Sequence, residues 1–169
     1  SAASLAIASL LQTNPLVGFI IAAALTTTTG YTGYLHTPRV MLANLERQAK
    51  QYGLDDAVRN CTPDRFLADG DVVSFGGHEF QVLHCPGHTP GHVVFYHASG
   101  VAFVGDVLFQ GSIGRTDFPR GNHAQLIESI RSKLWPLGND VTFVPGHGPE
   151  STFGFERRTN PFVADALFD

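Results

Sequence analysis

The chain has 169 residues, with 11 lysines and arginines, 15 aspartates and glutamates, and a formal net charge of −4. This length fits one domain of ordinary size, so we predict a single domain over residues 1–169. The basic residues are scattered along the chain, which argues against a nucleic-acid partner. Two cysteines, Cys61 and Cys85, are too few for a disulfide framework, and we therefore expect a cytoplasmic protein.

The first segment, residues 1–38, contains no aspartate, glutamate, lysine or arginine, whereas about a quarter of the residues in a typical soluble domain are charged. Its apolar run from Leu16 to Leu25 is much shorter than the roughly 20 residues that a transmembrane helix needs. We therefore expect no membrane partner and interpret the run as a buried strand or a pair of helices. A signal peptide is the alternative, although no basic residues precede the run.

Ordinary signals of secondary structure begin at Thr37 and Pro38, which are typical of a helix start, and the helix should end before Gly53. Two short strands, residues 71–75 and 78–83, flank a pair of glycines and should form a hairpin. Asn122 should cap an amphipathic helix from residue 123 to about residue 134, which Trp135 and Pro136 should end. Its inward face should carry Leu126, Ile127, Ile130 and Leu134.

The most informative stretch is residues 83–92, LHCPGHTPGH, which places three histidines and two Pro-Gly turns between two strand-like runs. Asp106 and His147 also follow apolar strand-like runs. Imidazole and carboxylate are donors that zinc and similar metals favour, and strand ends can bring them from separate rigid elements to one point. We therefore predict a metal site where this stretch, Asp106 and His147 converge.

The ordered motifs PGHTPGH, GD and PGHG, with GSIGRTDF between the last two, resemble those of the metallo-β-lactamase superfamily, and within it the glyoxalase II-like hydrolases. The resemblance covers about residues 51–169. It implies an α/β fold of the αββα sandwich type, with the site at one edge of its two sheets. Strands followed by helices, without an internal repeat, agree with such a mixed α/β sandwich.

The resemblance also implies roles for individual residues. His88, Asp106 and His147 would be metal ligands, and Asp106 would be the catalytic carboxylate that bridges two metals. Zinc is the expected metal, with iron or manganese as alternatives. His92 would brace the loop behind the ligands, and Arg115 and Asp117 would form a local salt bridge near the site.

The implied activity is hydrolysis of a small-molecule thioester by a metal-bound hydroxide, as in hydroxyacylglutathione hydrolase (glyoxalase II). GRTDF, residues 114–118, also resembles the iron-dependent persulfide dioxygenases, which makes oxygen chemistry at a single iron the alternative. A third hypothesis is a non-catalytic relic of the fold. The sequence indicates no particular oligomeric state.

The relic hypothesis depends on one departure from the family pattern. The family carries a THxHxDH motif upstream of PGHTPGH, whereas residues 25–33 of this chain read LTTTTGYTG. Three explanations are open: loss of half the site, a rearranged or shortened N-terminal half, and an error in the sequence of this segment. We favour the third, since the uncharged run stops where family-like sequence begins. In the family fold, residues 27–32 would lie against His88, Asp106 and His147.

Overall fold

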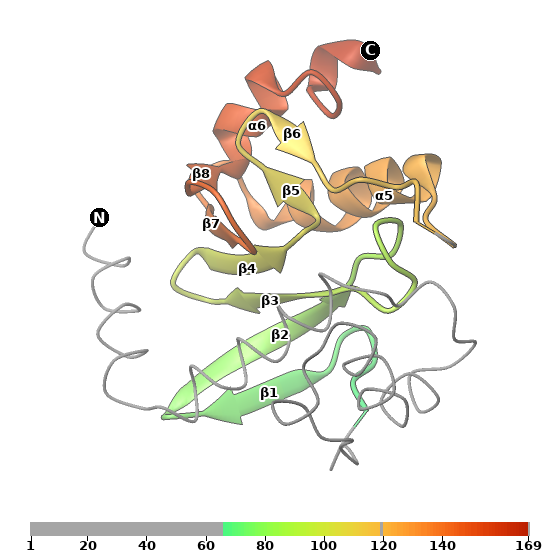
Figure 1. Ribbon diagram of the computed structural model, residues 1–169. Coiled ribbons are helices and arrows are strands. Elements are labelled where there is room, and N and C mark those ends of the chain that lie inside the picture. The colour runs from blue at the N-terminus through green and yellow to red at the C-terminus, as the bar shows by residue number, and fades with distance from the viewer. Residues whose placement is uncertain (1–65, 119, 169) are drawn as a thin grey trace.

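A six-stranded sheet forms the centre of the computed structural model, which describes residues 66–118 and 120–168 (Figure 1). Its strand order is β1-β2-β3-β4-β7-β8. The strands are β1 (Val72–Phe75), β2 (His78–His84), β3 (Val93–His97), β4 (Val101–Gly105), β7 (Thr142–Pro145) and β8 (Ser151–Thr152). All neighbours are antiparallel except β4 and β7, which run parallel. The carboxyl ends of β4 and β7 therefore meet at one edge of the sheet.

The predicted hairpin is confirmed as β1 and β2, with Phe75 paired to His78 across a turn of two glycines. β2 extends one residue further than predicted, because His84 still pairs with Val93 of β3. A separate antiparallel ribbon consists of β5 (Leu108–Phe109) and β6 (Ser112–Ile113). Gly111 closes its turn with a φ of 69°, a conformation that glycine adopts without a steric penalty.

The predicted helix after Asn122 is correct in its start and its buried face. The side chain of Asn122 accepts a hydrogen bond from the Gln125 amide, and all four predicted inward residues are buried. Its extent to Leu134 is also correct, but the helix type of its last part was not predicted. α5 (His123–Ser129) passes into a π-helical turn, η2 (Ile130–Leu134), where the Trp135 amide bonds the carbonyl of Ile130, five residues back. A 3-10 turn, η3 (Trp135–Leu137), follows. Pro136 lies in its first turn, where a backbone N–H would have no helical partner, so the N–H that proline lacks costs no hydrogen bond.

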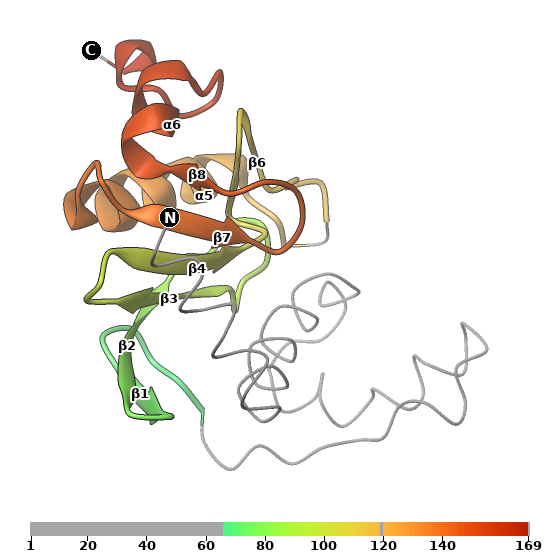
Figure 2. The same cartoon turned by 90° about the vertical axis from the view of Figure 1, so that its left-hand side faces the viewer.

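The C-terminal part holds α6 (Phe153–Thr159) and a short 3-10 turn, η4 (Asp165–Leu167). The side chain of Thr152 caps α6 by accepting a hydrogen bond from the Phe155 amide. Figures 1 and 2 both show α5 and α6 on the same side of the sheet. Within the described ranges, no helix has the length and apolar character needed to cross a membrane.

The core lies mainly between that face of the sheet and the helices. Along β4, Ala102 and Val104 join the large cluster with residues of α5, η2 and α6, whereas Val101 and Phe103 join a smaller cluster on the opposite face. Every residue of β4 is buried, so this strand is covered on both faces. The described residues supply one large sheet of the expected αββα sandwich. The helix predicted after Pro38 and the threonine-rich loop lie outside them.

Candidate metal centre

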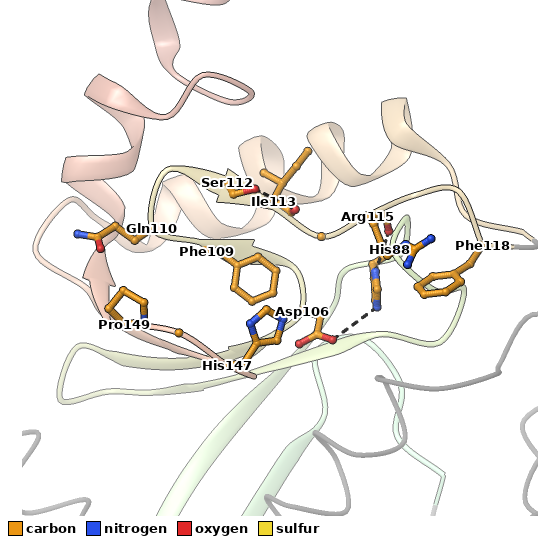
Figure 3. Close-up of a pocket in the computed structure, with 12 residues that line it drawn as sticks. His88, Asp106, Phe109, Gln110, Ser112, Ile113, Arg115, Phe118, His147 and Pro149 are labelled. Carbon is orange, nitrogen blue, oxygen red and sulfur yellow. Dashed lines mark hydrogen bonds and ion pairs between the residues drawn. The ribbon is translucent and has the colours of Figure 1, made fainter. Parts of the chain in front are cut away.

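Three loops at one edge of the sheet carry the predicted ligands (Figure 3). Asp106 directly follows β4, and His147 follows the parallel strand β7, so both side chains emerge at the same edge. The Gly146 amide donates a hydrogen bond of 2.9 Å to the carbonyl of Gly105, which ties the two strand ends together. His88 comes from the loop between β2 and β3. All three residues line one pocket of about 570 Å³.

His88 is buried and held in one orientation. Its Nδ1 lies 2.7 Å from the main-chain carbonyl oxygen of Arg115. A carbonyl only accepts hydrogen bonds, so Nδ1 is the donor and carries the hydrogen. The opposite ring nitrogen, Nε2, faces Asp106 Oδ2 at 3.7 Å. Metal-ligating histidines are oriented in this way, with one nitrogen bonded to a carbonyl and the other turned to the site.

The carboxylate of Asp106 is also buried, and its Oδ1 has no hydrogen-bond partner among the described residues. A buried polar atom without a partner is costly, and a cation is one group that would satisfy it. Two glycines leave room around this residue. A Cβ at Gly146 would lie 2.2 Å from Asp106 Oδ1, and one at Gly114 would lie 2.0 Å from the Asp106 carbonyl oxygen.

These observations fit a divalent metal held in part by His88 and Asp106. In residues 66–118 and 120–168, no group of three or more histidine, cysteine, aspartate or glutamate side chains is placed to hold one ion. The family motif that would add further ligands corresponds to residues 25–33, which read LTTTTGYTG in this chain and lie outside the described residues. The assignment of the three ligands stays a prediction.

His147 is exposed, and its imidazole stacks on the ring of Phe109 with centroids 4.4 Å apart and 27° between the planes. Figure 3 shows its ring beside the carboxylate of Asp106. Phe109 comes from the β5–β6 ribbon, which also gives Gln110, Ser112 and Ile113 to the pocket wall. Phe109 was not among the residues predicted for the site. Its position in an apolar run after Asp106 carries no signal that would separate it from a core residue.

Two further histidines brace the loop that carries His88. His92 is 1% exposed, and burial lowers the pKa of its imidazole to about 4, so the ring is neutral at pH 7. Its Nε2 lies 3.1 Å from the Val104 carbonyl oxygen, and its ring meets His88 edge-on. His84 Nε2 lies 2.8 Å from the Pro90 carbonyl oxygen across the same loop. Both side chains therefore hold the loop through main-chain oxygens.

The predicted salt bridge between Arg115 and Asp117 is confirmed. Arg115 Nε donates to Asp117 Oδ1 at 2.6 Å, and this hydrogen bond lowers the pKa of the Asp117 carboxyl. Both side chains are largely exposed to solvent. The Arg115 guanidinium lies over the ring of Phe118, 4.5 Å from its centroid, and Phe118 in turn meets His88 edge-on. Arg115 lines the pocket and also supplies the carbonyl that orients His88.

Comparison with known proteins agrees with this geometry. Residues 22–147 match the Metallo-beta-lactamase superfamily. The chain belongs to this superfamily. The predicted family and the metallo-β-lactamase fold are thus confirmed, and the superfamily supports a metal-dependent, hydrolase-type enzyme.

Hydroxyacylglutathione hydrolase GloC of Haemophilus influenzae is 49% identical over 127 residues, which are 74% of this chain and 59% of GloC. A second relative, an uncharacterised protein of Aquifex aeolicus, is 44% identical over 62% of this chain and 50% of its own length. The chain therefore spans between half and three fifths of the length of these two relatives.

Among solved structures, TTHA1623 in a di-iron-bound form has a TM-score of 0.61 and 42% identity, covering 75% of this chain and 62% of its own. ETHE1 from Myxococcus xanthus has a TM-score of 0.56 and 36% identity, covering 58% of this chain and 45% of its own. Both similarities extend to sequence as well as fold.

Proposed function

We propose that this chain carries the active site of a zinc-dependent thioesterase of the hydroxyacylglutathione hydrolase type. The observation that carries the proposal is the buried pair of His88 and Asp106, in which Nε2 faces the carboxylate and Oδ1 has no partner among the described residues. The 49% identity to GloC supports a glutathione thioester as the substrate. Iron or manganese in place of zinc is compatible with the same donors.

When bound, a divalent metal would polarise the thioester carbonyl and lower the pKa of a bound water towards neutrality. His88 and Asp106 are the described residues that would hold it, and His147 is the third predicted ligand. Asp106 would orient the attacking water. The reaction adds water across the acyl–sulfur bond, which breaks to give a carboxylic acid and a thiol. Phe109, Ile113 and Phe118 line the pocket with apolar side chains that would exclude other water from the reacting carbonyl.

A second candidate function is iron-dependent persulfide oxidation. It is favoured by the GRTDF sequence at residues 114–118 and by the likeness to ETHE1. Its ligand requirement is smaller, because two histidines and one carboxylate suffice for a mononuclear iron site. The two functions differ in their products, since one releases a thiol without oxygen and the other consumes oxygen.

The deciding experiment uses the full chain loaded in parallel with zinc and with iron(II). Each preparation is given S-lactoylglutathione, with thiol release as the readout, and glutathione persulfide, with oxygen uptake as the readout. Our proposal expects thiol release that is lost in Asp106→Asn. The release should be retained in Asp140→Asn, the matched variant at an exposed carboxylate outside the pocket. Oxygen uptake by the iron form without thiol release would establish the second candidate. Absence of both activities would leave the non-catalytic relic.

A further inference from the structure

A second buried carboxyl group lies outside the metal pocket, on α6. Glu156 is 0% exposed. Its Oε1 accepts a hydrogen bond of 2.6 Å from Ser151 Oγ, and its Oε2 accepts bonds from the Gly111 amide at 2.8 Å and from Asn160 Nδ2 at 2.9 Å. In the part of the chain that the structure describes, no cation pairs with it. Because burial of a polar group is costly without hydrogen bonds, these neutral donors must stay in place.

Asn160 extends this contact to both strands of the ribbon. This residue ends α6 and is fully buried. Besides Glu156, its Nδ2 donates to the carbonyl oxygen of Ser112 at 3.1 Å and approaches that of Phe109 at 3.4 Å. Glu156 and Asn160 therefore hold the main chain of β5, of the turn at Gly111 and of β6 against α6. Main-chain contacts of this kind fix where the ribbon lies, whatever its side chains are.

The ribbon held in this way is one wall of the metal pocket. Phe109 reaches from it to stack on His147. Among the described residues, His147 makes no side-chain hydrogen bond, so this stack is the contact that orients its imidazole. The other donor to Glu156, Ser151, lies four residues after His147 and two after Pro149, which lines the pocket. A single carboxyl group thus contacts both the ribbon and the segment that follows His147.

We propose that Glu156 is a positioning residue for the pocket, which sets the ribbon and, through Phe109, the imidazole of His147. This inference deepens the proposed function and rests on it for its catalytic consequence. Its structural part, the attachment of the ribbon, does not depend on the substrate. A purely structural role in α6 would stabilise the whole chain without a selective effect on the ribbon or on His147.

The test compares three variants of the full chain. Glu156→Leu removes the acceptor, and Glu156→Gln keeps one acceptor oxygen and a group that can donate to Ser151. Arg157→Leu is the matched control, because Arg157 lies on the same helix but pairs with Asp165 at 2.8 Å instead of contacting the ribbon. Amide hydrogen exchange of residues 107–113 is measured by mass spectrometry, together with kcat/KM for thioester hydrolysis.

We expect Glu156→Leu to accelerate exchange in the ribbon selectively and to lower kcat/KM by up to about 10-fold. This is the lower end of the usual effect of losing a residue that contacts a metal ligand, because Glu156 acts on His147 only through Phe109. Glu156→Gln should have ribbon exchange and kcat/KM close to the wild-type values, and Arg157→Leu should resemble wild type in both. Phe109→Ala alone should lower kcat/KM. In the Glu156→Leu background it should lower kcat/KM little further, because the effects of coupled residues are not additive. Ribbon exchange unchanged in Glu156→Leu, or equal acceleration in Arg157→Leu, overturns the proposal.

Should Glu156→Leu fail to fold, the milder Ser151→Ala removes one of the three donors and should shift exchange and kcat/KM in the same direction by a smaller factor. Wild-type values for Ser151→Ala would then overturn the proposal. Wild type without thioesterase activity would contradict the proposed function alone, because the exchange measurement still decides whether Glu156 holds the ribbon.

Discussion

His88 turns its Nε2 towards the carboxylate of Asp106, 3.7 Å away, while the main-chain carbonyl of Arg115 accepts a hydrogen bond from its Nδ1. The hydrogen on Nδ1 places the lone pair of a neutral His88 ring on Nε2, the atom that faces Asp106. A nitrogen donor and a buried carboxylate oxygen thus meet at the carboxyl end of β4. The two side chains depend on each other for the chemistry we propose.

Replacing Asp106 with asparagine keeps the size of the side chain and removes its negative charge. We expect zinc affinity and hydrolysis to fall by at least about 10- to 100-fold, because the loss of a ligand should cost no less than the loss of a residue behind one. The melting temperature without metal should change little. Zinc binding, measured by equilibrium dialysis, tests this, with Asp140→Asn as the control at an exposed carboxylate outside the pocket. Unchanged zinc affinity in Asp106→Asn would contradict the assignment.

Gly146→Ala should disable the same site sterically. The new methyl group would lie 2.2 Å from Asp106 Oδ1, closer than any real contact, so the carboxylate must move. We expect zinc binding and thiol release to be lost together. Gly91→Ala is the matched control, since a Cβ at Gly91, in the loop between His88 and His92, would meet open space. A Gly146→Ala protein that binds zinc as wild type does would show that the space around Asp106 is not needed.

The stability of the chain should depend on pH through Asp69. Its Oδ1 accepts hydrogen bonds from Lys133 Nζ at 2.9 Å and from the His84 amide at 2.7 Å, and the Lys133 bond is the main cause of its lowered pKa. Since the folded pKa lies below the unfolded one, the carboxylate stabilises the fold above the unfolded pKa, about 3.9, and this stabilisation is lost as the pH falls through the folded pKa.

Urea unfolding of wild type and Asp69→Asn, compared at about pH 6 and about pH 3, measures this contribution. The difference in unfolding free energy should be present at the higher pH and shrink at the lower one. A difference that stays constant would mean that Asp69 acts through the size or packing of its side chain and not through its charge.

Cys85 should be chemically inert in the folded chain. It is fully buried, and burial raises the pKa of its thiol to about 12. The thiolate is the reactive form, so alkylation of Cys85 at about pH 8 should be slow in buffer and fast in urea. A Cys61→Ser background leaves Cys85 as the one remaining thiol. Rapid labelling of the native protein would contradict the burial of this side chain.

The strand ends that carry the ligands could be predicted because their signals are local. Alternation of apolar and polar residues located the strands, and glycine and proline marked the turns before His88 and His147. The π-helical turn after Ser129 could not be predicted, because the spacing of buried residues does not separate it from an α-helix over one turn. The prediction of a single domain over residues 1–169 remains a prediction.

The supports of the pocket were missed for a different reason. Glu156 contacts the amide of Gly111, 45 residues earlier in the chain, and Phe109 meets His147 across the pocket. Such contacts exist only after the sheet has brought distant segments together. The sequence alone predicts Glu156 to be an exposed helical residue, since glutamate is rarely buried. Gly146 was missed as well, because its closeness to Asp106 Oδ1 exists only once β4 and β7 lie side by side.

The most direct test measures zinc content and S-lactoylglutathione hydrolysis in the same preparations of wild type, His88→Gln, Asp106→Asn and His147→Gln. We predict that wild type binds zinc and releases thiol, and that each substitution lowers zinc affinity and kcat/KM together while the chain stays folded. Full zinc occupancy and activity in any of the three variants would contradict the placement of the metal between these side chains.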